Sequence, residues 1–364
     1  MPEKTYIVRL FFRNALHIGS PKSGAGVESS LDFIHSDTLW AAIANYWAII
    51  GSANGISFRD FLDGFAAEKD DESKPTPNVP LFTLSSAFPF SVKGRDSRYL
   101  LPKPLSVSFG LSQLYPPDKR SNERKLYAKT LKSSRFISRE HFAGWQEFTR
   151  PMGRSVFLRQ SERIGDDAIR PQSSIDRLTT NSNLFHSALT YMKPVSDREG
   201  LYFLVRTADD RVVGALETVL QVICEVGGIG GDVSSGCGEL RSFTIRQIQD
   251  DDDSWACLRG PENPNAHCLL SLCVPSSTEH SSDQYVAYDT VIRKGWTGSL
   301  STTMQRKRKT VHMLSEGSVL LSKKPGRLVK LTPDLIATPE WSGLHDIYRY
   351  GFAFLVPIRI NLND

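Results

Sequence analysis

The residues from 227 to 240 combine many glycines with two adjacent hydroxyl side chains. The stretch GGIGGDVSSGCGEL holds six glycines and the pair Ser234 and Ser235, directly after a segment of helical periodicity. Glycine adds conformational entropy to the unfolded chain, so such a run indicates unusual backbone angles or the close approach of something large. Backbone amides and hydroxyl groups are common partners of phosphates and sugars. The stretch therefore predicts a loop that lies against a sugar–phosphate backbone.

Three better-known motifs do not fit this loop. No lysine stands where a Walker A sequence requires one, and a G-x-G-x-x-G match that starts at Gly228 fails at Val233. The G-x-S-x-G nucleophile elbow is absent around the two serines. Phosphate-binding glycines precede a helix, whereas these follow one. A helix C-cap at Gly227 or Gly228 with a tight turn explains one or two of the glycines. The remaining glycines indicate that the loop has a functional role.

Basic side chains are concentrated in two parts of the chain, although the formal net charge is only +4. Residues 118–170 contain 13 Lys and Arg against 7 Asp and Glu. A second cluster, QRKRK followed by SKKPGRLVK, lies between residues 305 and 330. Such clusters suit a polyanion, and they also suit a solvated face. For residues 305–330, contact with RNA and contact with an acidic protein face both remain open.

The cysteine pattern and the hydropathy indicate a cytoplasmic protein. No two of the five cysteines have the C-x-x-C spacing, which argues against a zinc site and for a reducing compartment. No apolar run approaches the roughly 18–20 residues of a membrane span. The N-terminal segment has charges on both sides of a short apolar run, so it predicts a first strand better than a signal peptide. We expect no metal and no cofactor.

The hydrophobic periodicity predicts an order of strands and helices. The two helices are the best defined, because apolar residues recur at helical spacing in both of them, and Ser36 or Asp37 is a plausible N-cap of the first. Residues 184–194 and 200–208 are expected to form a pair of strands around a turn. The predicted elements are a strand within 5–19, a helix within 35–50, a hairpin of 80–92 and 98–107, the strand pair just named, a helix over 211–226 and a strand over 239–248.

This order predicts an α+β protein with tandem ferredoxin-like (RRM-like) domains. Strand–helix–strand–strand–helix–strand is the ferredoxin-like plan. The first domain covers residues 1–250, with a polar, basic insertion at about 111–183 and the glycine-rich loop 227–238 after its second helix. Residues 249–265 resemble a linker, and the carboxylates at 250–253 are expected to be solvated. The strand-rich remainder, 251–364, is expected to form a degenerate second ferredoxin-like domain.

Four stretches of the sequence resemble the RAMP superfamily of CRISPR-associated proteins. The helix, the glycine-rich loop with small polar residues and the following strand match the pattern of that superfamily. HIGSPKSGAGVESSLDFIHSDTLWAAI, IRPQSSIDRLTTNSNLFHSALTYMKPVSDREGLYFLV and the terminal YRYGFAFLVPI are similar to the family of the fourth subunit of the type III-A Csm effector complex. The resemblance covers both ends and the middle of the chain and is weaker from about 51 to 150.

The resemblance implies a non-catalytic, RNA-binding role. Subunits of this family hold the 5′ handle of the CRISPR RNA and contact the large polymerase-like subunit and the adjacent RAMP backbone subunit. RNA handles are bound through splayed bases, phosphates and 2′-hydroxyls. Asp37 is expected to cap or orient the loop that follows the first strand. The residues expected to contact RNA are His17, Gly19, Lys22, Ser36, Arg154, Arg170, Arg177, Gly228, Gly230, Gly231, Ser234, Ser235, Gly236 and Gly238.

Two other functions are weighed against RNA binding. Some RAMP relatives cut precursor CRISPR RNA, and metal-free cleavage needs a base and a proton donor. His17, His35 and His186 are the candidates here, with no second group known to converge on His17. The third possibility is a scaffold that binds only protein, for example through Trp40 and Trp47 of the first helix, although core packing explains these side chains better.

Overall fold

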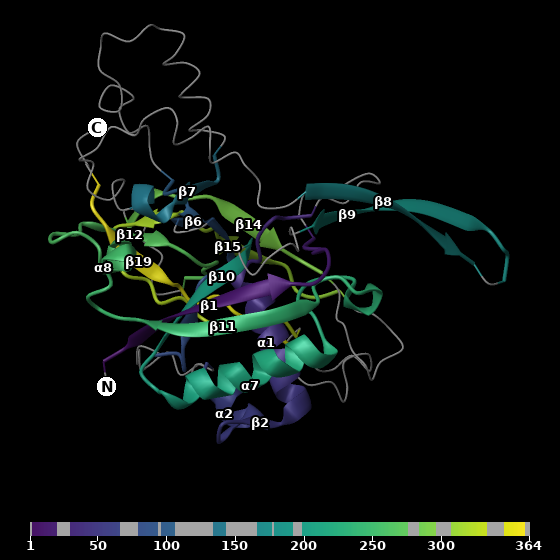
Figure 1. Cartoon of the computed structure of the whole chain (residues 1–364), viewed down its shortest axis with the longest axis horizontal. Helices are drawn as coiled ribbons and strands as arrows, with labels where there is room; N and C mark the ends of the chain where they lie inside the picture. Colours follow the sequence, from purple (N-terminus) through teal and green to yellow (C-terminus); the bar gives the residue numbers. More distant parts are fainter. Residues whose placement is uncertain are drawn as a thin grey trace, which may run out of the picture.

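The computed structural model describes most of the chain in eleven segments. They are residues 2–19, 30–65, 79–93, 96–105, 134–142, 166–176, 178–191, 199–275, 284–295, 307–332 and 346–360. The termini and the segments between these ranges lie outside the described residues. The described elements form two antiparallel sheets, two long helices and one projecting β-ribbon (Figure 1).

The first sheet has the ferredoxin-like strand order. Its central strands run in the order β11-β1-β10-β5, and every neighbouring pair is antiparallel. In chain order these strands are the fourth, first, third and second of a strand–helix–strand–strand–helix–strand unit, which confirms the predicted plan. The elements of the unit are β1 (Lys4–Phe12), α1 (Ser36–Ile50), β5 (Phe88–Lys93), β10 (Glu199–Thr207), α7 (Arg211–Val226) and β11 (Leu240–Ile248).

Short elements extend this sheet and its helices. The predicted hairpin continues the sheet from β5 into β6 (Asp96–Pro102) and then β7 (Phe136–Ser138), and β4 (Thr83–Leu84) pairs with the end of β10. Between α1 and the sheet extension lie β2 (Ser52–Ala53), β3 (Ile56–Ser57) and α2 (Phe58–Asp63).

The two helices bury the apolar stripes that the sequence predicts. On α1, Leu39, Ile43 and Trp47 recur every four residues and are fully buried. On α7, Leu216 and Ile223 belong to the same buried core. The predicted N-cap of α1 is wrong by one or two residues: His35 occupies the N-cap, and its side chain makes no capping hydrogen bond. Tertiary contacts, described below, hold the start of this helix instead.

The second sheet repeats the strand order of the first without the long helices. Its order is β13-β16-β12-β19. Read from β19, these are the fourth, first, third and second strands of the unit along the chain. Within the described residues, no helix follows α8 (Ala256–Arg259), so this unit is degenerate in the predicted sense. Its strands are β12 (Ala266–Leu269), β13 (Tyr285–Ala287), β16 (Val319–Leu320) and β19 (Leu355–Ile358), with the small ladders β14 (Thr290–Arg293)–β15 (Val311–Leu314) and β17 (Val329–Lys330)–β18 (Tyr348–Arg349).

The two sheets share one hydrophobic core. Ile7 and Tyr202, on the face of the first sheet that points away from the helices, pack in the same buried cluster as Cys268 and Val356 of the second sheet. A separate core lies between the first sheet and its helices, and Tyr350 from the C-terminal segment enters it. The boundary predicted at residue 250 stays a prediction, because the units on either side of it bury surface against each other.

One part of the predicted pairing is wrong. The segment expected to be loop holds β8 (Asp166–Ile175), which pairs with β9 (Ser182–Tyr191) over ten residue pairs. The sequence predicted that β9 pairs with the strand after it, whereas that strand, β10, is a central strand of the first sheet. The β8–β9 ribbon projects from the body of the protein (Figure 1). In the part of the chain that the structure describes, no helix is long and apolar enough to cross a membrane.

Candidate RNA interface

The glycine-rich loop folds back on itself directly after α7. The amide of Ile229 donates to the carbonyl of Gly238 over 3.0 Å, and the amide of Cys237 donates to Asp232 over 3.2 Å. Between them lies the single 3-10 turn η1 (Val233–Ser235). The side chain of Ile229 is fully buried in the core under α1 and α7. The loop is therefore a closed structure anchored by an apolar residue.

The loop also packs on the segment that follows β1. The amide of Gly231 donates to the carbonyl of His17 over 2.8 Å, and the amide of Gly238 donates to Ala15 over 2.8 Å. On the other side, the amide of Arg13 donates to Glu239 over 2.9 Å. These bonds join two segments that are more than 200 positions apart in the sequence. They hold the loop in place against the segment that follows β1.

The glycines are required by the protein itself, which corrects the reason given for them above. A Cβ atom at Gly238 would lie 2.0 Å from the carbonyl oxygen of Ile229, and one at Gly227 would lie 1.9 Å from the hydroxyl oxygen of Tyr46. Gly230 and Gly231 approach His17 in the same way. Close packing of the chain on itself thus accounts for most of the glycines, and an RNA backbone is not needed to explain them.

The base of the β8–β9 ribbon closes the third side of this region. Leu16 and Thr190 exchange two backbone hydrogen bonds of 2.8 and 2.9 Å. The Nδ1 atom of His17 lies 2.9 Å from the carbonyl oxygen of Ala188. Below these contacts a small buried cluster joins the three segments through its members Ala15, Leu189 and Cys237. The ribbon, the segment after β1 and the glycine-rich loop therefore form one continuous surface.

A basic side chain stands beside the loop. Arg170 lies on β8 opposite Ser187 and is exposed. Burial raises the pKa of the Cys237 thiol, the charge of Asp232 raises it further, and Arg170 opposes both. The guanidinium is therefore close enough to the loop for its charge to act there. An exposed phosphate next to the loop would meet this cation and the loop hydroxyls together.

The structure sorts the predicted contact residues into three groups. Exposed members gather around the loop, and we call them the loop surface: Gly19, Arg170, Gly230, Ser234 and Ser235. Gly231 and Gly236 are partly exposed at its margin, whereas Gly228 and Gly238 are buried inside the loop. The amide of Gly228 is 3.0 Å from the hydroxyl of Tyr46, so the predicted role of this amide in binding phosphate is corrected. Lys22, Arg154 and Arg177 lie outside the described residues.

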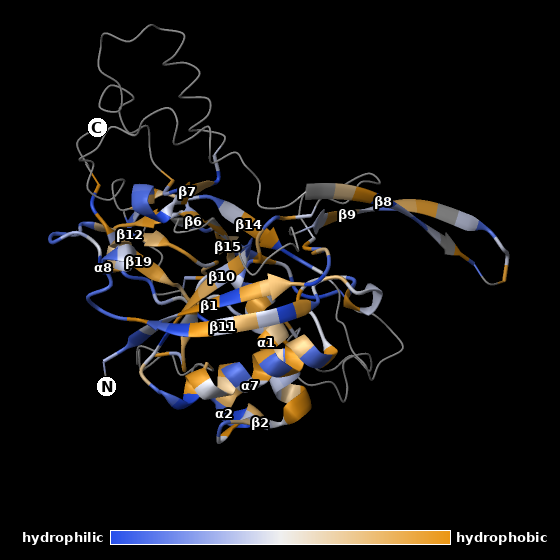
Figure 2. Ribbon diagram, viewed as in Figure 1, coloured by the Kyte–Doolittle hydropathy of each residue, from blue (hydrophilic) through white to orange (hydrophobic). Residues whose placement is uncertain are grey.

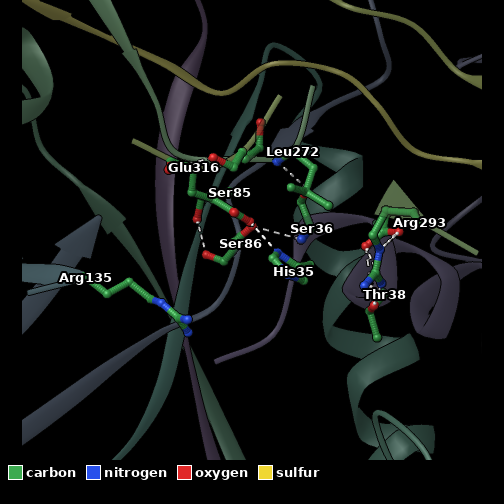
Figure 3. Close-up of polar contacts among 12 residues, drawn as sticks. His35, Ser36, Thr38, Ser85, Ser86, Arg135, Leu272, Arg293 and Glu316 are labelled. Atoms are coloured by element: carbon green, nitrogen blue, oxygen red, sulfur yellow. Dashed lines mark hydrogen bonds and ion pairs between the residues drawn. The ribbon is translucent and has the colours of Figure 1, made fainter. Parts of the chain in front are cut away.

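Ser36 and His17 have positions that the sequence did not indicate. Ser36 is fully buried. Its amide donates to the Oγ atom of Ser86 over 2.9 Å, and its Oγ atom accepts from the amide of Leu272 over 3.0 Å (Figure 3). These bonds tie the start of α1 to the segment before β5 and to the segment after β12, so the expectation that Ser36 contacts RNA is corrected. His17 is 8% exposed and lies mainly under the loop, as a support of Gly231.

Sequence reasoning missed the apolar side chains of the ribbon. Ile175, Leu178 and Leu184 are exposed by 65%, 94% and 66%, and Phe185 is exposed by 41%. Figure 2 shows hydrophobic colour along the ribbon well away from the two cores. The sequence predicts LFHSALTY only as one strand of a pair with residues 200–208, and it gives no indication that this segment is part of a projecting ribbon.

Comparison with known proteins agrees with this architecture. The family CRISPR Csm4 C-terminal domain matches residues 262–358, which contain the second sheet. This part of the chain is similar to the C-terminal domain of Csm4. A chain of the Csm1–Csm4 cassette in complex with pppApA has a TM-score of 0.55 and 17% identity over 100% of both chains. The cassette in complex with AMPPNP gives 0.56 and 17% over 99% of both. At this identity the two structures show a shared fold. No curated protein sequence matches the chain.

Together, the match to the Csm4 C-terminal domain and the full-length fold similarity support a subunit of a type III CRISPR effector. The tandem ferredoxin-like architecture predicted from the sequence is shown by the same similarity and by the two sheets described above.

Proposed function

We propose that this Csm4-like chain is a non-catalytic subunit of a type III-A Csm complex that binds the 5′ handle of the CRISPR RNA. The observation that carries the proposal is the loop surface, where Ser234 and Ser235 lie exposed and the charge of Arg170 on β8 reaches Cys237 of the same loop. Hydroxyls on a closed loop and a guanidinium on a neighbouring strand suit sugar and phosphate contacts along a single strand. The close packing of the glycines supports the proposal, because it pre-organises the surface and lowers the entropic cost of binding.

The proposed protein partners are the large polymerase-like subunit and the adjacent RAMP backbone subunit. Two solved structures that share the fold are cassettes of Csm1 and Csm4, which supports a large subunit as partner. In this arrangement the chain anchors the large subunit, supports antiviral defence and acts in the cytoplasm. The five cysteines, four of which are buried, form no disulfide in the part of the chain that the structure describes, which is compatible with a reducing compartment.

RNA cleavage is the second candidate function, and the positions of the histidines do not favour it. His17 is bonded to a backbone carbonyl under the loop, and His35 is bonded to Glu316 in the interior. His35 and Glu316 are 5% and 6% exposed at their side chains, which leaves little access for a 2′-hydroxyl.

The test uses the reconstituted complex and labelled CRISPR RNA with and without its handle. We expect the double variant Ser234→Asp, Arg170→Ala to lose protection of the handle, because it adds a carboxylate and removes a cation at the loop surface without placing a side chain at one of the tightly packed glycines. Arg59→Ala is the matched control, since Arg59 is 90% exposed on α2, far from the ribbon in Figure 1. RNA without a handle should bind all variants equally.

Three results would contradict the proposal in different ways. Unchanged handle protection with loss of only the large subunit would make the chain a protein scaffold. Equal losses of handle protection in the double variant and in Arg59→Ala would show that binding depends on the net charge of the protein and not on the loop surface. Cleavage of the labelled RNA without metal, abolished by His17→Ala, would show the enzyme instead.

A further inference from the structure

Three guanidinium groups gather at the N-terminus of α1, around a single buried carboxylate. Arg293 of β14 donates through Nε to Asp37 over 2.8 Å and through Nη2 over 3.0 Å. The same Nη2 atom is 2.8 Å from the hydroxyl of Thr38 (Figure 3). Arg349 of β18 donates through Nη1 to Asp37 as well. Asp37 is 4% exposed, so these charges meet in the interior where the second sheet covers the helix.

The third guanidinium belongs to Arg308, from the basic cluster whose role the sequence left open. Its amide donates to Gly295 over 2.9 Å, which places it at the end of the β14–β15 ladder. Burial lowers the pKa of Arg308, the charges of Arg349 and Arg293 lower it further, and Asp37 opposes them. The charge of Arg308 therefore acts together with those of the other two arginines, and its amide hydrogen bond to Gly295 holds it two residues past the end of β14, the strand that carries Arg293.

Positive charge exceeds negative charge in this cluster. The second carboxylate nearby is Glu316, which is bonded to His35 over 2.8 Å and to the hydroxyl of Ser86. Its charge raises the pKa of Arg293, as the charge of Asp37 does. Two carboxylates thus face three guanidinium groups even before His35 is counted. Crowding of like charges out of water is unfavourable unless a counter-charge is supplied.

Two buried donors in the cluster have no acceptor among the described residues. They are the Nε–H groups of Arg308 and Arg349. Arg349 is only 6% exposed, so water does not replace the missing partner easily. A buried donor without an acceptor costs roughly 1–3 kcal/mol, and more when it is charged. The positive end of the fifteen-residue helix α1 points to the same place.

We propose that Arg293, Arg308 and Arg349 form an anion site that takes a phosphate group at the N-terminus of α1. The planar fork of arginine matches phosphate oxygens in pairs. Arg308 is only partly buried, and its neighbours Lys307 and Lys309 are exposed, so the site opens along this edge. The phosphate belongs to the RNA backbone if the proposed function holds, and free phosphate is the other source of the same chemistry.

The site would join the two halves of the protein. Asp37 and Thr38 come from α1 of the first unit, whereas Arg293 and Arg349 lie within the part that matches the Csm4 C-terminal domain. A phosphate bound there neutralises the surplus charge and holds both units together. It therefore stabilises the fold as well as the bound anion.

The first experiment measures the melting temperature of the full-length chain with inorganic phosphate, against chloride at equal ionic strength. Phosphate at ten times its dissociation constant multiplies the folded-to-unfolded ratio by about 11. We expect the wild type to gain this stabilisation and Arg308→Gln to lose it. Without phosphate, Arg308→Gln should be at least as stable as the wild type, because it relieves the crowding with Arg293 and Arg349. Lys307→Gln is the matched control for the loss of one charge and should respond to phosphate normally.

The second experiment identifies the source of the phosphate through RNA binding by the reconstituted complex. Removal of one phosphate contact by Arg308→Gln should lower the slope of log K against log salt by about 1. A loss of the phosphate response with a lower slope supports an RNA phosphate, and the same loss with an unchanged slope supports a free anion. No phosphate response in the wild type and an unchanged slope would overturn the proposal. A failure of the handle test with Arg170 leaves the phosphate response intact, so the two proposals fail separately.

Discussion

Two glycines of the loop separate the effect of backbone angle from the effect of close packing. Gly236 and Gly238 both have left-handed backbone angles, with φ of +82° and +71°. Alanine at either position therefore meets the same strain, roughly 1–2 kcal/mol. The space around them differs: the nearest atom to a Cβ at Gly236 is Nδ2 of Asn14 at 3.6 Å, whereas a Cβ at Gly238 meets the oxygen of Ile229 at 2.0 Å.

The clash at Gly238 cannot be relieved cheaply. Moving the oxygen of Ile229 displaces a backbone whose side chain is fully buried, and it opens the 3.0 Å bond between Ile229 and Gly238. Overpacking of a tight site costs about 1–3 kcal/mol. We therefore expect Gly238→Ala to lose about 1–3 kcal/mol more free energy of unfolding than Gly236→Ala.

Urea unfolding of the full-length chain measures both losses, with handle binding by the reconstituted complex as the second readout. Gly236→Asn should be close to the wild type, because asparagine tolerates the left-handed region, and Gly238→Asn should remain destabilised. Gly238→Ala should also weaken handle binding, since the loop surface depends on the closed loop. Equal losses for the two alanine variants would refute the reasoning and show that only the backbone angle matters.

Three further predictions concern the contacts between the two units. Asp37→Asn should lower the free energy of unfolding in urea by about 3–5 kcal/mol, because two buried arginines lose their carboxylate. Asp63→Asn, in an exposed pair, should change this free energy by less than about 0.5 kcal/mol. Burial alone raises the pKa values of Asp37 and Glu316, but the charges beside them hold both below the ordinary values. The stability they contribute is thus present above about pH 4 and falls as the pH drops further. In acid titrations followed by circular dichroism, Asp37→Asn should show the shallower loss, and a steeper one would contradict this sign. Tyr350→Phe removes the hydroxyl that is 3.0 Å from the buried amide of Leu84, and it should lower the free energy of unfolding, measured by heating, by about 1–3 kcal/mol. No change in stability would show that a water molecule replaces this hydroxyl.

The sequence predicted the first sheet and its helices well because their patterns are local. The stripes of α1 and α7 have helical spacing, and β1 and β11 alternate, so burial could be inferred without knowing the partners. The pairing of β8 with β9 was missed, because β8 is polar along DDAIRPQSSI and largely exposed. β8 therefore lacks the alternation that marks a half-buried strand, although β9 shows it.

The glycine-rich loop was predicted in position, but the reason for its glycines was not. The glycine-rich loop was located from composition alone. The reason for its glycines lies in Tyr46 and His17, which are distant in sequence and come together only through the ferredoxin-like strand order. Asp37 was taken as a cap, whereas its partners are Arg293 and Arg349, and residue separations of 256 and 312 leave no local signal. Asp37 and Arg349 both lie in stretches that carry the family resemblance, HSDTL and YRYG, but the resemblance does not pair them.

Photo-crosslinking from the loop surface tests the central proposal most directly. A photo-reactive amino acid at Ser234, in a complex assembled with labelled CRISPR RNA, should crosslink to nucleotides of the 5′ handle. The same group at Arg59 should give no crosslink to the handle. Crosslinks from Ser234 to neighbouring protein chains, with none to RNA, would contradict the account and make this surface a protein interface.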